Sequence, residues 1–254
     1  MTTPAADLTA TAPVRAVTVD LDDTLYPQSA YLAAAWGQVA EAGARLGLPE
    51  AQLLAALEEI AAAGSDKGTI IDRALLAVGV EPDRLRLFVP ALVDAFAAFA
   101  PTSLACYPGV VDALRLVRSR VPLALITDGS PRGQYAKIDA LGLVGAFDAV
   151  VVSDELGGRH LRKPHPAPFR AALARLGAGA AGTVHIGDRP AKDVAGTGRL
   201  GMRCIRVLTG EYAEWPAGDG YAAWLTVADF VSAVTAIEPL LPRREREDAA
   251  FLQR

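Results

Sequence analysis

Short, apolar, β-branched runs alternate with amphipathic helical patterns over most of this 254-residue chain, and this alternation restricts the possible folds most strongly. The apolar runs lie at residues 14–20, 121–127, 147–153, 183–187 and 202–208, and each ends in turn residues. Helical patterns lie between or beside them at residues 109–120, 131–141, 166–176 and 190–200. Such alternation predicts an α/β fold in which a parallel sheet with right-handed crossovers lies between two layers of helices.

Residues 27–105 interrupt this alternation. Their four amphipathic, Ala- and Leu-rich patterns lie at residues 29–46, 49–63, 69–78 and 82–100, separated by Gly- and Pro-containing turns. We therefore predict an all-helical insert placed directly after the first strand. The predicted organisation is a core of residues 14–26 and 106–241, the insert at 27–105 and a charged tail at 242–254, with a short last strand and helix within 224–241.

Composition and charge exclude several classes of protein. The formal charge of -4 and the pI near 5.4 argue against a nucleic-acid-binding surface, which needs clustered Lys and Arg. No apolar run approaches the roughly 18 residues of a membrane span. Residues 1–13 lack the basic and apolar blocks of a signal peptide. The two cysteines lie far apart in the sequence, so we expect a reducing, cytoplasmic location. The charge and the lack of an apolar span lead us to expect no nucleic-acid or membrane partner.

Two acids, Asp20 and Asp22, end the first apolar run, with Thr24 two residues further on. Asp20 lies where the buried strand ends, and Asp22 is expected to point the same way from the following turn. Carboxylates this close raise each other's pKa unless a cation lies between them. The pattern indicates a hard metal ion, a carboxylate nucleophile and a carboxyl proton donor at one place.

Polar groups also follow other strands. They are Thr127, Asp128 and Gly129 after the second, Lys163 in the loop beyond the third, and Asp188 with Asp193 after the fourth. Ligands of open parallel sheets bind at the carboxyl ends of strands. We therefore expect these groups to converge on one edge of the sheet.

In sequence order, these segments resemble the four motifs of the haloacid dehalogenase superfamily of phosphohydrolases. The segments are Asp20-Leu21-Asp22-Asp23-Thr24, Thr127-Asp128-Gly129, Lys163-Pro164, and the stretch from Gly187 to Asp193. The resemblance covers about residues 14–241 and implies a Rossmann-like core with a helical cap. It also implies Mg²⁺-dependent hydrolysis of a small phosphate ester through an aspartyl-phosphate.

The resemblance implies a role for each acidic residue. Asp20 attacks phosphorus, while Asp22 protonates the leaving alcohol and then deprotonates the attacking water. Mg²⁺ binds Asp20, the backbone carbonyl of Asp22, and Asp188, and keeps several waters. Asp193 orients either Lys163 or a metal-bound water.

The resemblance also implies how the phosphate is held. Lys163 neutralises the nucleophile and the transferring group, and Thr127 with the turn amides beside Gly129 holds phosphate oxygens. Arg132 is a further candidate substrate contact. Lys67, in a glycine-flanked loop of the cap near Arg73, is a candidate for reading the substrate; it is one of only four lysines among 25 basic residues.

Two positions depart from the family pattern. Asp128 stands where Asn is common, so it either adds negative charge near the site or caps the helix that begins at Pro131; we favour the cap. His165 replaces a common Asp. Basic residues close to it (Arg159, His160, Arg162) either bind a second anionic group or form a solvated loop.

Less specific interpretations apply to other residues. Thr24 is predicted to support the nucleophile loop, Asp23 to be an ordinary turn residue and His185 to be a hydrogen-bonded core histidine. The GxGxxG match at 196–201 follows a helix and precedes a strand, so we consider it accidental.

Several alternatives remain for function and assembly. A phosphomutase would use the same aspartyl-phosphate. Dehalogenation has no use for the acid Asp22, and a catalytically silent binding protein would not need the complete set of groups. We expect a monomer or a homodimer.

Overall fold

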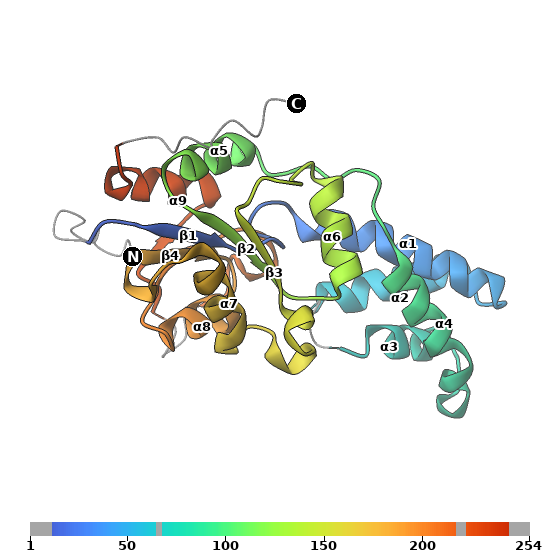
Figure 1. Cartoon of the computed structure of the whole chain (residues 1–254). Helices are drawn as coiled ribbons and strands as arrows, with labels where there is room; N and C mark the ends of the chain where they lie inside the picture. The colour runs from blue at the N-terminus through green and yellow to red at the C-terminus, as the bar shows by residue number, and fades with distance from the viewer. Residues whose placement is uncertain (1–11, 65–67, 217–221, 244–254) are drawn as a thin grey trace. The chain divides into compact units, whose positions relative to one another are not determined.

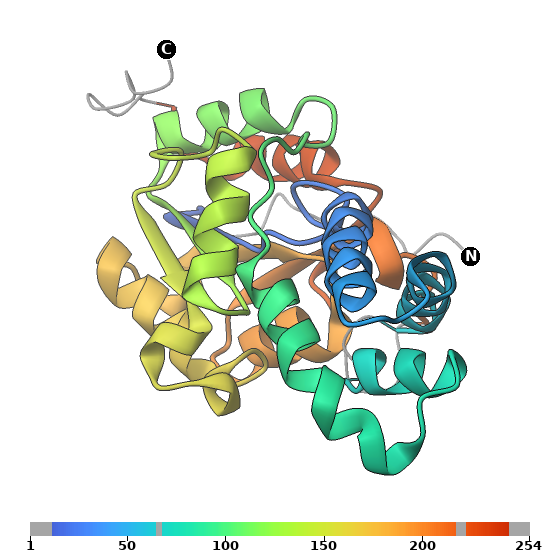
Figure 2. The ribbon, with the colours of Figure 1, turned by 90° about the vertical axis from the view of Figure 1, so that its right-hand side faces the viewer.

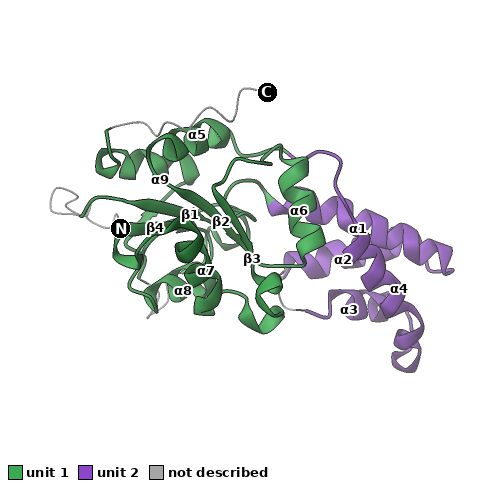
Figure 3. Ribbon diagram, in the orientation of Figure 1, with its two compact units in different colours: residues 1–27, 105–254 green, residues 28–104 purple. Residues whose placement is uncertain are grey.

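The computed structural model describes residues 12–64, 68–216 and 222–243. The chain divides into two compact units, one formed by Met1–Pro27 with Ala105–Arg254 and the other by Gln28–Leu104 (Figure 3). We describe the two units separately.

The first unit is built on a parallel sheet. Its described strands are β1 (Ala16–Val19), β2 (Leu123–Thr127), β3 (Ala149–Val152), β4 (Thr183–Gly187), β5 (Arg203–Val207) and β6 (Leu225–Val227). They are ordered β3-β2-β1-β4-β5-β6, and every neighbouring pair is parallel. The predicted Rossmann-like α/β fold is therefore confirmed.

Helices cover both faces of this sheet. They are α5 (Val110–Arg120), α6 (Pro131–Ala140), α7 (Pro166–Leu176), α8 (Ala195–Gly198) and α9 (Phe230–Ile237). Figure 1 shows α5 and α9 on one face and α7 and α8 on the other, in agreement with the packing of α5 on α9 and of α7 on α8. All residues of β1, β2 and β4 are buried, which explains why these strands are continuous apolar runs.

Short helical turns connect these elements. They are η3 (Ser153–Leu156), η4 (Arg159–Leu161), η5 (Ala180–Gly182), η6 (Pro190–Val194), η7 (Gly210–Tyr212) and η8 (Glu238–Leu240). The helix expected over residues 190–200 was only partly right, because it consists of the π-helical turn η6 followed by the four-residue α8. Such wide turns occur frequently at functional sites.

The second unit contains only helical elements among its described residues. They are α1 (Gln28–Arg45), α2 (Glu50–Ala62), α3 (Ile70–Ala77), the 3₁₀ turn η2 (Pro82–Arg84) and α4 (Leu85–Ala98). Figure 2 shows α1 between α2 and α4, and α1 packs against both. Its core includes Trp36, Leu53, Leu57, Leu75 and Leu92, with the Trp36 and Phe96 rings 4.6 Å apart.

Candidate active site

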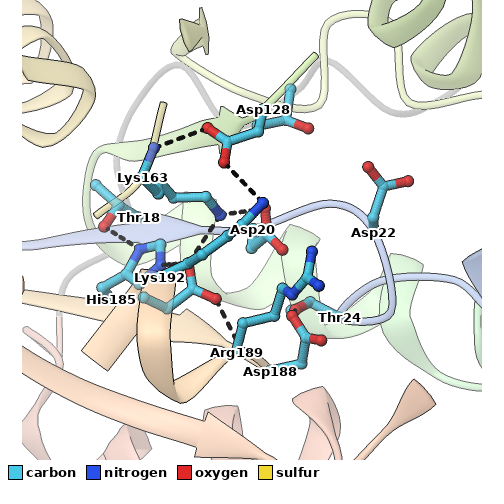
Figure 4. A network of polar contacts seen from close by, with 12 residues as sticks. Thr18, Asp20, Asp22, Thr24, Asp128, Lys163, His185, Asp188, Arg189 and Lys192 are labelled. Atoms are coloured by element: carbon cyan, nitrogen blue, oxygen red, sulfur yellow. Dashed lines mark hydrogen bonds and ion pairs between the residues drawn. The ribbon is translucent and has the colours of Figure 1, made fainter. Parts of the chain in front are cut away.

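The carboxyl ends of β1, β2 and β4 bring polar residues to one edge of the sheet. Asp20 follows β1, Thr127 ends β2 and Asp188 follows β4. The strand order reverses between β1 and β4, and open α/β sheets bind ligands at such a switch point. Figure 4 shows Asp20, Lys163 and Asp188 gathered there.

Lys163 is buried between two carboxylates. Its Nζ lies 2.5 Å from Oδ1 of Asp20 and 2.7 Å from Oδ1 of Asp193, and its side chain is only 2% exposed. Burying an ammonium group is costly unless it is paired, so these two contacts are what stabilise the lysine here. The prediction that Asp193 orients Lys163 agrees with this geometry.

Asp193 is held on both oxygens by protein donors. Besides Lys163, His185 Nε2 lies 3.0 Å from Oδ1, and the backbone N–H of Arg189 donates to Oδ2. A Cβ at Gly187 would lie 2.5 Å from Cγ of Asp193, so only glycine allows the carboxylate this close to the end of β4. Asp193 therefore serves better as a positioning group than as a metal ligand.

Asp188, unlike Asp193, has few hydrogen-bond donors among the described residues. Its Oδ2 is buried and makes no hydrogen bond with the described residues, while Oδ1 accepts a long contact of 3.5 Å from Thr24 Oγ1. Oxygen atoms of Asp20, Asp188 and Asp193 lie within 4.8 Å of one another. A buried carboxylate oxygen without a donor, beside a second carboxylate, fits a hard cation that binds oxygen ligands.

Burial and mutual charge shift the pKa values of these groups. Loss of solvation is the main reason that the pKa of Asp20 rises to about 7, despite the opposing charge of Lys163. The pKa of Asp188 also rises, through burial and then through repulsion by Asp20 and Asp193. Burial opposes ionisation of Asp193 too, but Lys163 and His185 outweigh it and lower its pKa. Burial likewise opposes the charge on Lys163, and the surrounding carboxylates overcome it and raise its pKa.

His185 is buried in β4, as predicted for a core histidine. Its Nδ1 lies 2.9 Å from Thr18 Oγ1, and its Nε2 contacts Asp193. Burial lowers its pKa, and a neutral ring protonated on Nε2 satisfies both contacts. His185 thus helps to fix the position of the Asp193 carboxylate, a contact that the sequence did not predict.

Asp22 lies apart from this cluster. Figure 4 shows its carboxyl group pointing away from Lys163 and Asp188. Its Oδ1 accepts hydrogen bonds from Lys137 Nζ at 2.8 Å and from the Tyr26 hydroxyl at 2.5 Å. The predicted metal contact through the backbone carbonyl of Asp22 remains a prediction, and its carboxylate is not one of the three clustered groups.

The prediction that Asp128 caps α6 is wrong. Ser130 is the N-cap, and its Oγ accepts the N–H of Gly133. Asp128 instead accepts the backbone N–H of Lys163 on Oδ1 at 3.0 Å, and Lys192 Nζ lies 3.3 Å from Oδ2. Its charge therefore lies at the site and is paired with a lysine.

Gln134 links the predicted phosphate-binding residues. Its side chain accepts the Thr127 hydroxyl at 3.1 Å and donates to the backbone carbonyl of Asp128 at 2.8 Å. Gly129 has a φ of 143°, and a Cβ there would lie 2.4 Å from Gln134 Nε2. Both the backbone conformation and the close approach of Gln134 require glycine in this turn.

The remaining candidates are Arg132, Lys67 and the basic loop of residues 159–165. Arg132 is exposed on α6, and Lys67 lies outside the described residues. In the basic loop, Arg162 makes a bidentate pair with Asp154, with both contacts at 2.7 Å. His165 caps α7 by accepting the N–H of Ala167. These two contacts favour a structural role for Arg162 and His165 over binding of a second anion.

Sequence reasoning missed Gln134, Lys137 and Lys192. One signal did point to the lysines: the chain has so few that each one is conspicuous. The three described lysines all contact aspartates at the sheet edge, namely Asp22, Asp20 with Asp193, and Asp128.

The chain belongs to the haloacid dehalogenase-like hydrolases, whose family model matches residues 14–201. A glyceraldehyde 3-phosphate phosphatase of Methanopyrus kandleri is 33% identical over 207 residues, covering 79% of this chain and 87% of that protein. The Pyrococcus furiosus protein of the same name is 30% identical over 241 residues, covering 93% and 95%. A phosphoserine phosphatase of Thermus thermophilus is 33% identical over 162 residues, covering 63% and 62%.

Solved structures agree on the fold. A crystal structure of a 2-haloacid dehalogenase from Pseudomonas syringae matches with a TM-score of 0.60 and 23% identity, covering 89% of this chain and 99% of that one. At this identity the likeness carries the fold alone. The prediction that the chain is a hydrolytic enzyme of this family is confirmed. Among the described residues, no helix is both long and apolar enough to cross a membrane.

Proposed function

We propose that this protein is a Mg²⁺-dependent phosphatase that hydrolyses a small phosphorylated metabolite through an aspartyl-phosphate on Asp20. One observation carries the proposal: the buried Asp20 carboxylate contacts Lys163 and lies beside Asp188, whose buried Oδ2 has no donor among the described residues. This arrangement supports a nucleophile, a fixed cation and a metal ligand acting together at one edge of the sheet.

The names of the relatives support the substrate class. Glyceraldehyde 3-phosphate and phosphoserine are both small monoesters, and phosphatases named for each are at least 30% identical to this chain. The second unit, as a helical cap, would exclude bulk water and supply specificity, which favours a small substrate over a phosphoprotein.

In the proposed reaction an Asp20 oxygen forms a bond to phosphorus while the ester oxygen leaves with a proton from Asp22. Water then attacks phosphorus while the bond from phosphorus to Asp20 breaks, Asp22 takes a proton from that water, and inorganic phosphate leaves. Lys163 neutralises the nucleophile and the transferring phosphoryl group. Thr127 and the amides beside Gly129 hold the phosphate oxygens. Mg²⁺, held by Asp20, Asp188 and the backbone carbonyl of Asp22, would supply further neutralisation of charge on the phosphoryl group.

A phosphate-release assay over a panel of small monoesters, run with Mg²⁺ and with a chelator, tests the proposal. We expect Mg²⁺-dependent release from at least one ester, and trapping of a phosphorylated protein from the same ester. Asp20→Asn should reduce turnover by on the order of 10⁴-fold or more, because it removes the nucleophile. Asp112→Asn is the matched control, since Asp112 is an exposed residue of α5 whose side chain is 83% accessible.

Three results would contradict the proposal. They are no phosphate release from any ester, full activity in the chelator, or normal turnover in Asp20→Asn. Conversion of a substrate into an isomeric phosphate without release would instead indicate a phosphomutase.

A further inference from the structure

Lys137 is a buried cation that the proposed reaction does not yet use. It lies near the end of α6, its side chain is 4% exposed, and its Nζ lies 2.8 Å from Oδ1 of Asp22. The two residues are 115 positions apart in the sequence, so the contact depends on the assembled fold. The hydroxyl of the fully buried Tyr26 donates to the same oxygen.

An ordinary structural role does not account well for this lysine. A basic residue near a helix C-terminus is favoured by the helix dipole, but an exposed side chain gains that effect without the cost of burial. The chain also places arginine, rather than lysine, at nearly all its basic positions. A compact ammonium group directed at one carboxylate oxygen is therefore a specific feature of the site.

The contacts distinguish the two oxygens of Asp22. Both described donors bind Oδ1, and this leaves Oδ2 as the oxygen that can face the ester. The carboxyl group becomes a carboxylate when its proton passes to the leaving oxygen. An ammonium 2.8 Å away then stabilises the negative charge as it forms.

From this geometry we infer that Lys137, assisted by Tyr26, is a positioning residue for Asp22. It fixes the orientation of the carboxyl group and stabilises the carboxylate formed when the leaving group is protonated. As the P–O bond of the ester breaks and the bond from Asp20 to phosphorus forms, the proton moves from Asp22 Oδ2 to the ester oxygen. The inference rests on the proposed phosphatase activity.

The test compares two leaving groups. An alkyl phosphate needs a proton on its leaving oxygen, whereas p-nitrophenyl phosphate releases a stable phenolate with little help. The value of kcat/KM covers steps up to the transfer to Asp20, so it isolates the protonation. For Lys137→Met we expect a loss of about 10²-fold with the alkyl ester and a much smaller loss with the aryl ester.

Three further variants complete the test. Tyr26→Phe keeps the buried ring and should show the same preference to a smaller degree. Lys137→Arg keeps the charge and should recover part of the loss with the alkyl ester. Arg115→Met removes an exposed ion pair with Asp112 elsewhere in the first unit, and should leave both kcat/KM values near wild type.

The outcomes separate the inference from the proposed function. Equal losses with both esters in Lys137→Met and Tyr26→Phe would overturn the positioning role while the phosphatase activity stands. If Lys137→Met does not fold, Tyr26→Phe alone decides, and an unchanged ratio of the two kcat/KM values refutes the inference. A wild-type protein that hydrolyses neither ester refutes the proposed function and this inference with it.

Discussion

Lys163 is the group whose removal should disturb this site most. It pairs with Asp20 at 2.5 Å and with Asp193 at 2.7 Å, and the two carboxylate side chains are 6% and 0% exposed. Lys163→Met removes the charge but keeps a long apolar side chain. Two buried carboxylates then lose their common counter-charge.

The expected cost follows from this burial. Removing one partner of a buried ion pair typically destabilises a protein by about 3–5 kcal/mol, because the other charge stays buried without compensation. We expect a loss in the upper part of that range at pH 8. Protonation of the stranded carboxylates should reduce the loss at lower pH.

The direction of the pH dependence can be worked out from the pKa shifts. In the wild type the pKa of Asp193 is lowered, so its favourable contribution is fully present between pH 5 and pH 8. Without Lys163, burial and mutual repulsion act on Asp20 and Asp193, with only His185 and the Arg189 N–H still opposing them at Asp193, so both pKa values rise. A group whose pKa is higher in the folded than in the unfolded state loses stabilisation as pH rises. The difference between variant and wild type should therefore grow from pH 5 to pH 8.

Urea denaturation at both pH values, in a chelator so that no metal replaces the lost charge, measures this difference. The double variant Lys163→Met with Asp193→Asn removes one stranded carboxylate and should recover stability without recovering activity. Arg115→Met, whose ion pair with Asp112 has side chains 48% and 83% exposed, should cost only about 0–1 kcal/mol at either pH. A loss below about 1 kcal/mol for Lys163→Met, or one that does not change with pH, would refute the reasoning.

Three further predictions concern the wild-type protein and the cap. Because the pKa values of Asp20 and Asp188 are raised, Asp20 from 3.8 to about 7, the metal-free protein should lose stability as pH rises from 5 to 8. At a Mg²⁺ concentration of 100 Kd, thermal denaturation should show about 2.7 kcal/mol of stabilisation, and no shift at pH 8 would contradict a metal site here. Replacing Lys67 or exposed Arg73 with Ala should alter KM or substrate preference more than the kcat for p-nitrophenyl phosphate. An unchanged profile over many esters would remove both residues from substrate recognition.

The sequence predicted the sheet and the positions of its acids because both depend on local patterns. Strands buried on both faces are continuous apolar runs, and the residue that ends such a run lies at the sheet edge. Asp20 and Asp188 could thus be placed without coordinates. The sequence pattern does not show how the two carboxylates differ in their hydrogen bonds. Asp20 accepts one from Lys163, whereas Asp188 Oδ2 has no donor among the described residues, and this difference depends on distances in the folded chain.

Asp128 shows where local reasoning failed. Asp and Ser both cap helices well, and the segment before α6 contains one of each. Pro131 occupies the first helical position, which makes the residue directly before it the cap. Asp128 lies two residues too early to cap, so its carboxylate is available to Lys163 and Lys192.

The contact between Lys137 and Asp22 was beyond local reasoning for a different reason. It joins α6 to the loop after β1, and neither segment carries a pattern that indicates the other. Only the scarcity of lysine, a property of the whole chain, set Lys137 apart. Composition can therefore mark a residue as unusual without showing which group it contacts.

The pairing of these lysines supports the proposed location of a metal ion. Four of the aspartates gathered at this edge contact a lysine: Asp20, Asp22, Asp128 and Asp193. Within the described residues, Asp188 makes no such pair, and its buried Oδ2 accepts no hydrogen bond. A buried carboxylate that lacks an ion-pair partner is costly, and burial with repulsion outweighs the charge of Arg189 and raises the pKa of this one. A cation bound from solution between Asp188 and Asp20 would remove that cost, and the same charge would make Asp20 available as a carboxylate for attack on phosphorus.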